Sequence, residues 1–340
     1  MNAAPLLEVS GLTRHFPVSV GLFGQDRGRV RAVDGVSFAV NRGETLGLVG
    51  ESGSGKSTLA RTALRLIDPT AGRIHFEGRD ITRSTQRELR PLRRQMQMVF
   101  QDPYASLDPR MTVEQIIGEA FAIHRLARGS ERSARVEHML AKVGLPAESM
   151  RRYPHEFSGG ERQRIGIARA LAVQPSLVLA DEPISALDVS IQAQIINLLM
   201  DLQRDLQLTY LFIAHDLRVV EFVSDRVAVM YLGRIVEIAT RDELYRAPRH
   251  PYTQMLFSAM LAGPRSAKTT SSAAQAESAA TGTPAGCAFH PRCRFATDEC
   301  RRSTPPLFDL GAGHAAACFL VRGEITGANG TPTESRAGST

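Results

Sequence analysis

The sequence predicts an α/β fold around a parallel β-sheet, with an antiparallel β subdomain, an inserted helical subdomain and a small cysteine-bearing module near the C-terminus. Three observations predict it. A glycine-rich segment stands between a short apolar strand and a helix, apolar strands alternate with helices after residue 160, and apolar residues recur at helical spacing between residues 112 and 144. The length of 340 residues allows one large domain or two ordinary ones.

The N-terminal part has the pattern of short strands with one helix among them. Apolar and polar residues alternate at its start, as they do in half-buried strands, and residues 21–28 form a polar, glycine-rich stretch that predicts a loop. The elements expected here are strands Leu6–Val9 and Val36–Val40, a buried strand Thr45–Val49, a helix Ser57–Leu66, an edge strand Ile74–Phe76 and a buried strand Met98–Phe100.

Between residues 112 and 144 the apolar residues recur at helical spacing, and strand–helix alternation returns after Gly160. The strand Leu177–Ala180 is apolar throughout, which is typical of a parallel strand covered on both faces. The elements expected after it are a helix Ser190–Leu206 with Ile191, Ile195, Leu198 and Leu202 on one face, a strand Tyr210–Ala214, a helix Leu217–Val223 and a hairpin Val227–Ile238 that turns at Gly233.

Composition predicts the organisation of the chain. Residues 263–286 are rich in Ala and Ser, with Thr among them, and too poor in large apolar residues to fold, so we expect a disordered linker there. The predicted parts are a main domain over residues 1–262 with a helical subdomain over 102–157 inside it, the linker, a cysteine module over 287–322 and a disordered tail over 323–340.

Charge and hydropathy exclude several classes of protein. No apolar run reaches the roughly 18 residues of a spanning helix, and no export signal opens the chain, so a cytosolic protein is expected. The net charge is +6, and the densest basic stretch, Arg87 to Arg94, contains an acid and a proline and no aromatic residue. This stretch predicts a solvated helix, and nucleic-acid binding is not expected.

The strongest motif is Gly50-Glu-Ser-Gly-Ser-Gly-Lys-Ser57, with a strand before it and a helix after it. This is the P-loop pattern in its required setting. Glycines at 53 and 55 let backbone N–H groups approach phosphate oxygens, and the start of the helix adds a positive dipole end. Lys56 is expected on the β- and γ-phosphates and the Ser57 hydroxyl on Mg²⁺.

Two adjacent acids at the end of a buried strand, Asp181 and Glu182, complement the P-loop. A metal-bound nucleotide needs a carboxylate in a fixed position, and hydrolysis needs a group that polarises water. We expect Asp181 to help hold Mg²⁺ and Glu182 to act on the attacking water.

A second phosphate cradle is predicted at Ser158, Gly159 and Gly160, which open a helix. Ser158 is a natural N-cap, and the glycines leave the first N–H groups accessible. One nucleotide does not need two such cradles on one chain. The second cradle is therefore expected to serve a nucleotide held by another subunit.

Taken together, the motifs resemble those of the ATP-binding-cassette (ABC) ATPases, over Leu6 to Leu261. Phe157 and Glu161 stand where Leu and Gln are commonest in that family's signature. The resemblance implies a P-loop core with an antiparallel and a helical subdomain, and ATP held between two subunits. It adds Gln101 on Mg²⁺, the loop Ser185–Asp188, a switch histidine at His215 and an adenine-stacking Phe16. The ATP-binding residues thus predicted are Phe16, Gly50, Glu51, Ser52, Gly53, Ser54, Gly55, Lys56, Ser57, Thr58, Gln101, Ser158, Gly159, Gly160, Asp181 and Asp188, and the catalytic residues are Lys56, Gln101, Glu182 and His215.

Three further stretches, Val99–Pro109, His250–Thr253 and Cys287–Cys293, resemble the bacterial oligopeptide/dipeptide importer ATPases, and residues 254–262 are more similar to the second, F-type, of their two ATPase subunits. The resemblance implies peptide import, although members of the branch also import nickel, glutathione or sugars. It implies a peripheral subunit on the cytoplasmic face of the membrane. The implied partners are a second ATPase subunit, favoured to be a different chain, two permease subunits and, indirectly, an extracytoplasmic binding protein. The alternative is a soluble ABC ATPase acting on ribosomes or DNA.

All four cysteines lie near the C-terminus, at Cys287, Cys293, Cys300 and Cys318. A short segment after a disordered linker lacks a core of its own, so the thiols suggest a metal staple. Some relatives are similar here and hold a [4Fe–4S] cluster. Zinc, with His290 and His314 completing the site, and plain thiols remain open, and disulfides are the weakest option in the cytosol.

Overall fold

The computed structural model describes residues 4–20, 25–262 and 284–322. The chain divides into two compact units, residues 1–235 and residues 236–340, and the division lies within strand β10 (Arg234–Thr240). The predicted tail and all but the last three residues of the predicted linker lie outside the described residues. Within the described ranges, no helix is long and apolar enough to cross a membrane.

The first unit opens with an antiparallel sheet in the order β2-β1-β4-β5. Its strands are β1 (Leu7–Val20), β2 (Gln25–Val40), β4 (Ala71–Phe76) and β5 (Arg79–Asp80). Two expectations were wrong. Residues 25–28 belong to a strand and not to a loop, because the backbone ladder of β1 and β2 continues to the pair Val20 and Gln25 whatever the polarity of the side chains. The strand around Ile74 is not an edge, because β5 pairs with its outer side.

A parallel sheet forms the centre of the unit, in the order β9-β3-β8-β7-β6. Its strands are β3 (Thr45–Val49), β6 (Met96–Val99), β7 (Leu177–Asp181), β8 (Thr209–Ile213) and β9 (Arg226–Tyr231). The residues of β3, β7 and β8 are all buried. In register, Leu48 faces Ile213 and Ile213 faces Asp181, so these three strands end at one edge of the sheet. Side chains that follow them therefore meet there.

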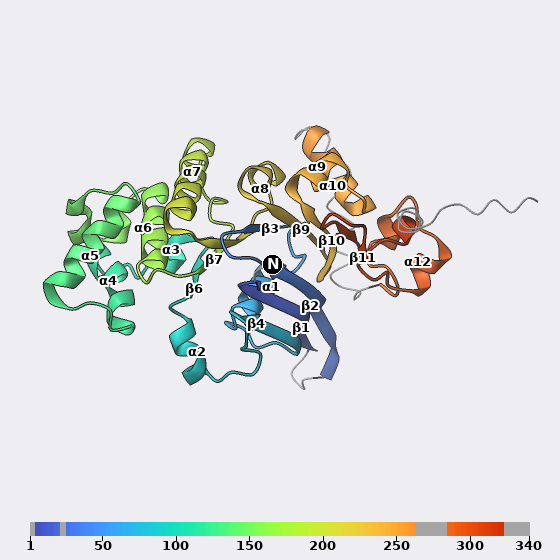
Figure 1. Cartoon of the computed structure of the whole chain (residues 1–340), viewed down its shortest axis with the longest axis horizontal. Helices are drawn as coiled ribbons and strands as arrows, with labels where there is room; N and C mark the ends of the chain where they lie inside the picture. Colours follow the sequence, from blue (N-terminus) through green and yellow to red (C-terminus); the bar gives the residue numbers. More distant parts are fainter. Residues whose placement is uncertain (1–3, 21–24, 263–283, 323–340) are drawn as a thin grey trace, which may run out of the picture. The chain divides into compact units, whose positions relative to one another are not determined.

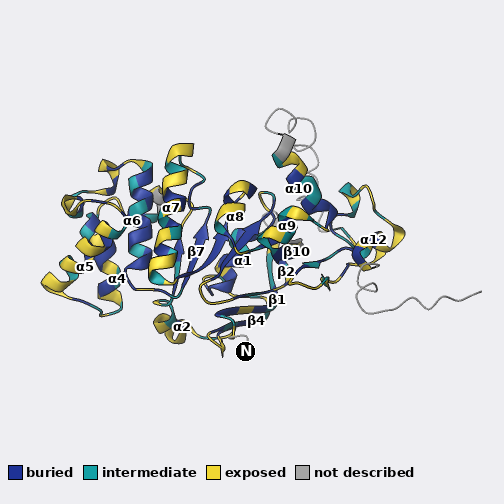
Figure 2. Ribbon diagram, turned by 45° about the horizontal axis from the view of Figure 1, so that its top comes forward, coloured by how far each residue is buried: buried dark blue, intermediate teal, exposed yellow. Residues whose placement is uncertain are grey.

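Helix α1 (Lys56–Ala63) contacts both β-sheets, and Figure 1 shows it between β3 and the antiparallel strands. Short helices and 3₁₀ turns then fill the range predicted as a helical subdomain: α3 (Pro103–Ser106), α4 (Val113–Ile123), α5 (Gly129–Lys142), η1 (Ala147–Arg151) and η2 (Pro154–Glu156). Helices α3, α4 and α5 pack on α6 (Gly159–Leu171), which is mostly buried, as Figure 2 shows. The basic stretch forms α2 (Gln86–Leu92), capped by Thr85.

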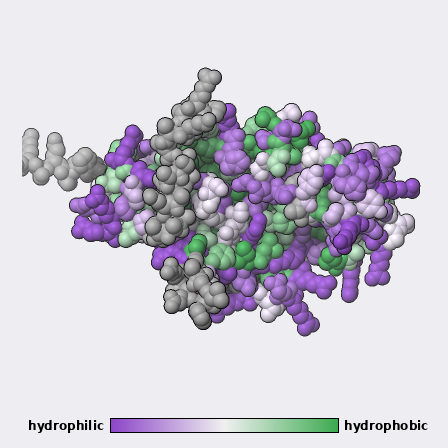
Figure 3. Space-filling view, turned by 180° about the vertical axis from the view of Figure 1, so that it is seen from behind, coloured by the Kyte–Doolittle hydropathy of each residue, from purple (hydrophilic) through white to green (hydrophobic). Residues whose placement is uncertain are grey.

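Helix α7 (Val189–Leu206) and helix α8 (Leu217–Val223) complete the alternation. The buried face of α7 consists of Ile195, Ile196, Leu199 and Leu202. This face is rotated from the expected one, because Ile191 and Leu198 are only partly buried. The molecular face drawn in Figure 3 is mostly hydrophilic, with smaller hydrophobic patches among the polar side chains.

The second unit joins β10 to the cysteine-bearing segment. Its other elements are α9 (Arg241–Arg246), α10 (Pro251–Ala262), η4 (His290–Arg292), α12 (Asp298–Arg302), β11 (Phe308–Asp309), β12 (Ala315–Ala316) and η5 (Phe319–Val321). Strand β12 pairs with β10, and Phe289 packs on the ring of Tyr252. The cysteine segment was expected to lack a core. Its strand β12 instead joins β10 in one sheet, and Ala316, Cys318 and Val321 are buried together.

Candidate nucleotide-binding site

The phosphate loop connects β3 to α1, and its shape depends on glycine. Gly53 and Gly55 have φ angles of 79° and 104°, which L side chains rarely adopt. A Cβ on Gly55 would lie 2.0 Å from the carbonyl oxygen of Ala32. The loop can therefore adopt this path only with glycine at position 55.

Lys56 lies inside this loop and is 5% exposed. Its Nζ donates to the carbonyl oxygens of Gly50 at 2.8 Å and Glu51 at 3.0 Å. Burial lowers the pKa of Lys56, while the nearby carboxylates of Glu182 and Asp181 oppose that shift. The structure thus brings the predicted phosphate-binding lysine close to both predicted acids.

Ser57 and Asp181, the two predicted Mg²⁺ ligands of the P-loop and the β7 strand, meet directly. The Ser57 hydroxyl donates to Asp181 Oδ1 at 2.8 Å, and Asp181 is fully buried. Arg61 Nη2 donates to the other carboxylate oxygen at 3.3 Å. Sequence reasoning missed Arg61, although its position one helical turn after Ser57 could have placed it on the same face of α1.

Glu182 lies at the centre of a second group. Its backbone is left-handed, with φ at 48°, and its Oε2 accepts a hydrogen bond from Gln101 Nε2 at 3.0 Å. His215 Nδ1 lies 3.6 Å from the same oxygen. Gln101 and His215, which follow β6 and β8, therefore converge on the carboxylate of Glu182, which follows β7.

The second cradle is a well-capped helix start. The Ser158 hydroxyl accepts from the Glu161 backbone N–H and donates to the Glu161 carboxylate at 2.7 Å. Ser158 is exposed, as is Asp188, which caps α7 without a side-chain hydrogen bond. Phe16 lies on β1, and the guanidinium carbon of Arg14 is 4.5 Å from the centroid of its ring.

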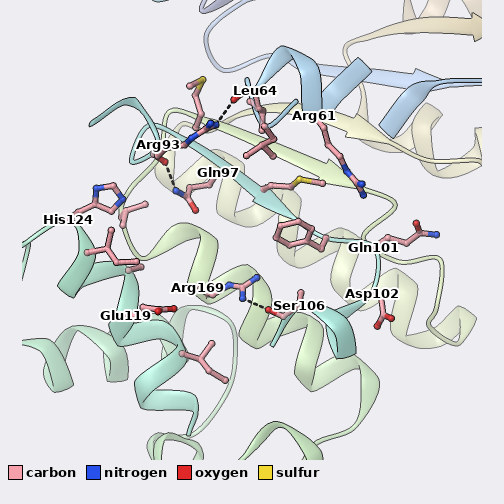
Figure 4. Close-up of a pocket in the computed structure, with 18 residues that line it drawn as sticks. Arg61, Leu64, Arg93, Gln97, Gln101, Asp102, Ser106, Glu119, His124 and Arg169 are labelled. Carbon is pink, nitrogen blue, oxygen red and sulfur yellow. Dashed lines mark hydrogen bonds between the residues drawn. The ribbon is translucent and has the colours of Figure 1, made fainter. Parts of the chain in front are cut away.

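A groove of about 690 Å³ lies beside this site in the first unit. Figure 4 shows Arg61, Gln101 and Asp102 at one part of it and Glu119 and His124 of the α4 region at another. Its apolar side chains include Leu66, Phe100 and Ile123, which are 48%, 39% and 50% exposed. Sequence analysis missed this groove, because its walls come from segments distant along the chain.

The four cysteines line one pocket in the second unit, together with Phe289, Phe295 and Phe319. Burial raises the pKa of the Cys318 thiol to about 11, and the other three cysteines add to the rise. The cavity is about 10 Å³, roughly the space of one water. Over the described residues, no group of three or more His, Cys, Asp or Glu side chains is arranged to hold a metal ion.

The two histidines considered for a zinc site differ. His290 lines the cysteine pocket, and its Nδ1 lies 2.9 Å from the Cys287 carbonyl oxygen. His314 instead pairs through Nε2 with the buried carboxylate of Glu237 at 2.7 Å. His314 lines a different pocket, with Glu243 and Arg249.

Comparison with known proteins identifies the family. A family described as "ABC transporter" matches residues 33–185, and one described as "Oligopeptide/dipeptide transporter, C-terminal region" matches residues 236–300. The chain is 52% identical to a probable peptide ABC transporter ATP-binding protein of Sinorhizobium fredii, over 96% of this chain and 93% of that one. It belongs to the ATP-binding subunits of oligopeptide/dipeptide ABC transporters. The oligopeptide transport ATP-binding protein AppF of Bacillus subtilis is 50% identical, over 94% of this chain and 98% of its own length.

Solved structures of ABC cassettes confirm the predicted fold. The ATP-binding cassette MJ0796, in a dimeric post-hydrolysis state bound to ADP and Pi, matches with a TM-score of 0.62 and 28% identity, over 69% of this chain and 98% of that one. The CbiO1 cassette of Clostridium perfringens, part of the ABC transporter complex CbiONQ, matches with a TM-score of 0.61 and 27% identity, over 72% and 91%. This ABC subunit is an ATPase that uses ATP and Mg²⁺.

Proposed function

We propose that this chain hydrolyses ATP to energise the import of peptides across the cytoplasmic membrane, as a peripheral subunit on its cytoplasmic face. One observation carries the proposal: identity of about half along nearly the whole chain, C-terminal region included, to proteins named as peptide transport ATP-binding proteins. A role on ribosomes or DNA is not favoured, because these relatives are transport proteins. The relatives named AppF and OppF support the F-type of subunit.

The geometry of the site supports the proposed roles, except that of Phe16, which rests on the resemblance to ABC ATPases. Backbone N–H groups of residues 50–58 and the Lys56 ammonium bind the phosphates, and Phe16 stacks on the base. Ser57, Asp181 and Gln101 offer the hard oxygen ligands that Mg²⁺ prefers, and the ion would neutralise charge on the phosphate oxygens. Gln101 holds one oxygen of Glu182, which leaves Oε1 to take the proton of the attacking water as the bond to the leaving ADP breaks. His215 stands beside the same carboxylate and orients it.

A second ATPase subunit completes the site. We infer that Ser158, Gly159 and Gly160 bind the γ-phosphate of a nucleotide held by that subunit, and that Asp188 lies at the interface. Two features support this arrangement: the exposure of Ser158 at the start of α6, where Gly159 is partly buried and Gly160 is buried, and the dimeric form of the MJ0796 cassette.

The groove beside Gln101 is the proposed contact with a permease subunit. Its exposed apolar side chains suit the apolar face of a helix, in the helix-in-groove mode of recognition. Gln101 lines the groove and also donates a hydrogen bond to Glu182. A partner bound in the groove would therefore contact a side chain that contacts the hydrolytic carboxylate.

Affinity purification from cells tests the function. The chain should copurify with two permease subunits, and its ATPase activity in the assembled transporter should rise with a peptide-loaded binding protein.

Ile123→Asp should weaken copurification about tenfold, because it places a charge in the apolar groove. Phe222→Asp is the matched control, since Phe222 is 57% exposed on α8 and does not line the groove. If nickel, glutathione or a sugar stimulates the ATPase activity and peptide does not, the proposed peptide cargo is wrong, although the chain is still a transporter subunit.

We propose further that the four cysteines hold a [4Fe–4S] cluster with a structural or redox role, with zinc as the alternative. The donor set supports it: four free thiols line one pocket, walled by phenylalanines. The cavity of about 10 Å³ means that the thiols must separate to admit a cluster.

Metal content decides between these options. Protein purified without oxygen should be brown and contain iron and acid-labile sulfide in equal amounts, and Cys318→Ser should lose most of both. His290→Ala should retain the cluster, because thiolates alone ligate it, whereas a zinc site completed by His290 would lose its metal. Colourless protein with zinc supports the alternative, and protein without metal leaves free thiols.

A further inference from the structure

Two side chains from other strands, His15 and Arg234, meet the carboxylate of Asp34 on β2. Its Oδ1 lies 3.1 Å from Nε2 of His15, on the neighbouring strand β1. Its Oδ2 accepts two hydrogen bonds from Arg234, from Nε at 3.1 Å and from Nη2 at 2.6 Å. Burial opposes ionisation of Asp34, but the hydrogen bonds of Arg234 and His15 outweigh it and lower its pKa. The Asp34 carboxylate is therefore held between His15 of β1 and Arg234 of β10. We call these three side chains the Asp34 clamp.

The backbone of the same residues leads to the phosphate loop. The N–H of Asp34 donates to the carbonyl oxygen of Gly233 at 2.8 Å, and the N–H of Gly233 donates to the carbonyl oxygen of Ser54 at 2.9 Å. Ser54 belongs to the phosphate loop. Two hydrogen bonds thus connect Asp34 to the loop that holds the nucleotide phosphates.

His15, the β1 member of the clamp, is next to the proposed base-stacking residue. His15 precedes Phe16 on β1, and these residues pair with Arg31 and Val30 of β2. The register of β1 against β2 shifts between Leu12 and Arg14 and again between Arg14 and His15. Backbone pairing is irregular just before His15, and the His15–Asp34 contact adds a side-chain connection between the two strands at this point.

We propose that Asp34, with His15 and Arg234, is a positioning unit that sets the Phe16 segment at a fixed distance from the phosphate loop, so that the site recognises base and phosphates as one ligand. The proposal rests on the base-stacking role proposed for Phe16. Asp34 itself contacts no part of the nucleotide under this proposal and acts through the two segments that it joins.

The test compares two ligands on the purified full chain. ATP reaches both Phe16 and the phosphate loop, whereas inorganic tripolyphosphate reaches the loop alone. Asp34→Asn should weaken ATP binding about tenfold, because it removes charge-assisted hydrogen bonds, and should leave tripolyphosphate affinity unchanged. In the assembled transporter, the same variant should raise KM for ATP and leave kcat nearly unchanged.

A double-mutant cycle shows whether the effect passes through Phe16. In a Phe16→Ala background, Asp34→Asn should cause little further loss of ATP affinity. Arg31→Gln is the matched control: Arg31 Nη1 lies 3.9 Å from Asp34 and is half-exposed, so ATP affinity should not change. Arg234→Lys, which keeps the charge but not the fork of two donors, carries the same test if Asp34→Asn fails to fold.

Three outcomes overturn the proposal. Equal weakening of ATP and tripolyphosphate would mean that Asp34 supports the loop alone. Unchanged ATP affinity in Asp34→Asn would mean that the clamp has no role in binding. Additive effects in the cycle would mean that Asp34 and Phe16 act independently. If Phe16→Ala alone leaves ATP affinity unchanged, the base-stacking assignment fails instead, which is a separate result.

Discussion

Glu182→Gln should retain ATP binding and lose ATP turnover by about 10²–10⁴-fold, the usual contribution of a general base. The substitution keeps the size of the side chain and removes its ability to take a proton. ATP affinity should persist, because Lys56 and the phosphate loop do not depend on the Glu182 carboxylate for their conformation: the Lys56 ammonium is held by the carbonyl oxygens of Gly50 and Glu51.

The measurement is phosphate release by the assembled transporter, with ATP binding to the same preparation measured in parallel. Asp216→Asn is the control. Asp216 follows His215 in the same loop, is exposed and caps α8 through Arg218 N–H, a role that Asn also performs. Turnover of Glu182→Gln at the wild-type rate would contradict the assignment, and loss of ATP binding would mean that Glu182 has a structural role.

The grouping of the candidate nucleotide-binding side chains could be predicted from sequence because its parts are local. The P-loop is one turn between a strand and a helix, and Asp181 and Glu182 follow one apolar strand. Parallel strands then bring those ends to one edge of the sheet, where Ser57 meets Asp181 and Gln101 meets Glu182. Only the strand order, which sequence reasoning did not supply, was needed to assemble them.

Contacts between distant segments could not be predicted in the same way. The Asp34–Arg234 pair spans 200 residues and joins β2 to β10. The His15–Asp34 pair depends on the register of β1 and β2, which shifts several times and has no sequence signal. The extent of these strands was also missed, since backbone pairing sustains them beyond the alternating pattern. The pairing of the cysteine segment with β10 was also missed, because β12 consists of two alanines and gives no strand pattern.

Gly159→Asp should leave ATP binding by the isolated chain unchanged and abolish hydrolysis at the site that this chain completes for its partner. The substitution fits the fold. A Cβ on Gly159 meets only Leu187 Cδ2, at 3.4 Å, and an acid in the first turn suits the positive end of the α6 dipole. In the closed dimer, however, the carboxylate would face the phosphates of the partner's nucleotide. Two like charges 4 Å apart at an effective dielectric constant of about 20 repel by about 4 kcal/mol, which predicts a loss of at least about 100-fold at that site.

Gly159→Asn is the matched control, because it has the same shape without the charge and should lose much less activity than Gly159→Asp. Phosphate release by the assembled transporter should fall by at least half in Gly159→Asp, since at least one of the sites uses this helix start. The isolated chain, shown to be monomeric by light scattering during the assay, should hydrolyse ATP slowly whether or not it carries the substitution. Weaker ATP binding by the isolated Gly159→Asp chain would mean that the second cradle binds the chain's own nucleotide. Fast turnover by the monomer would show that no second subunit is needed to complete the site.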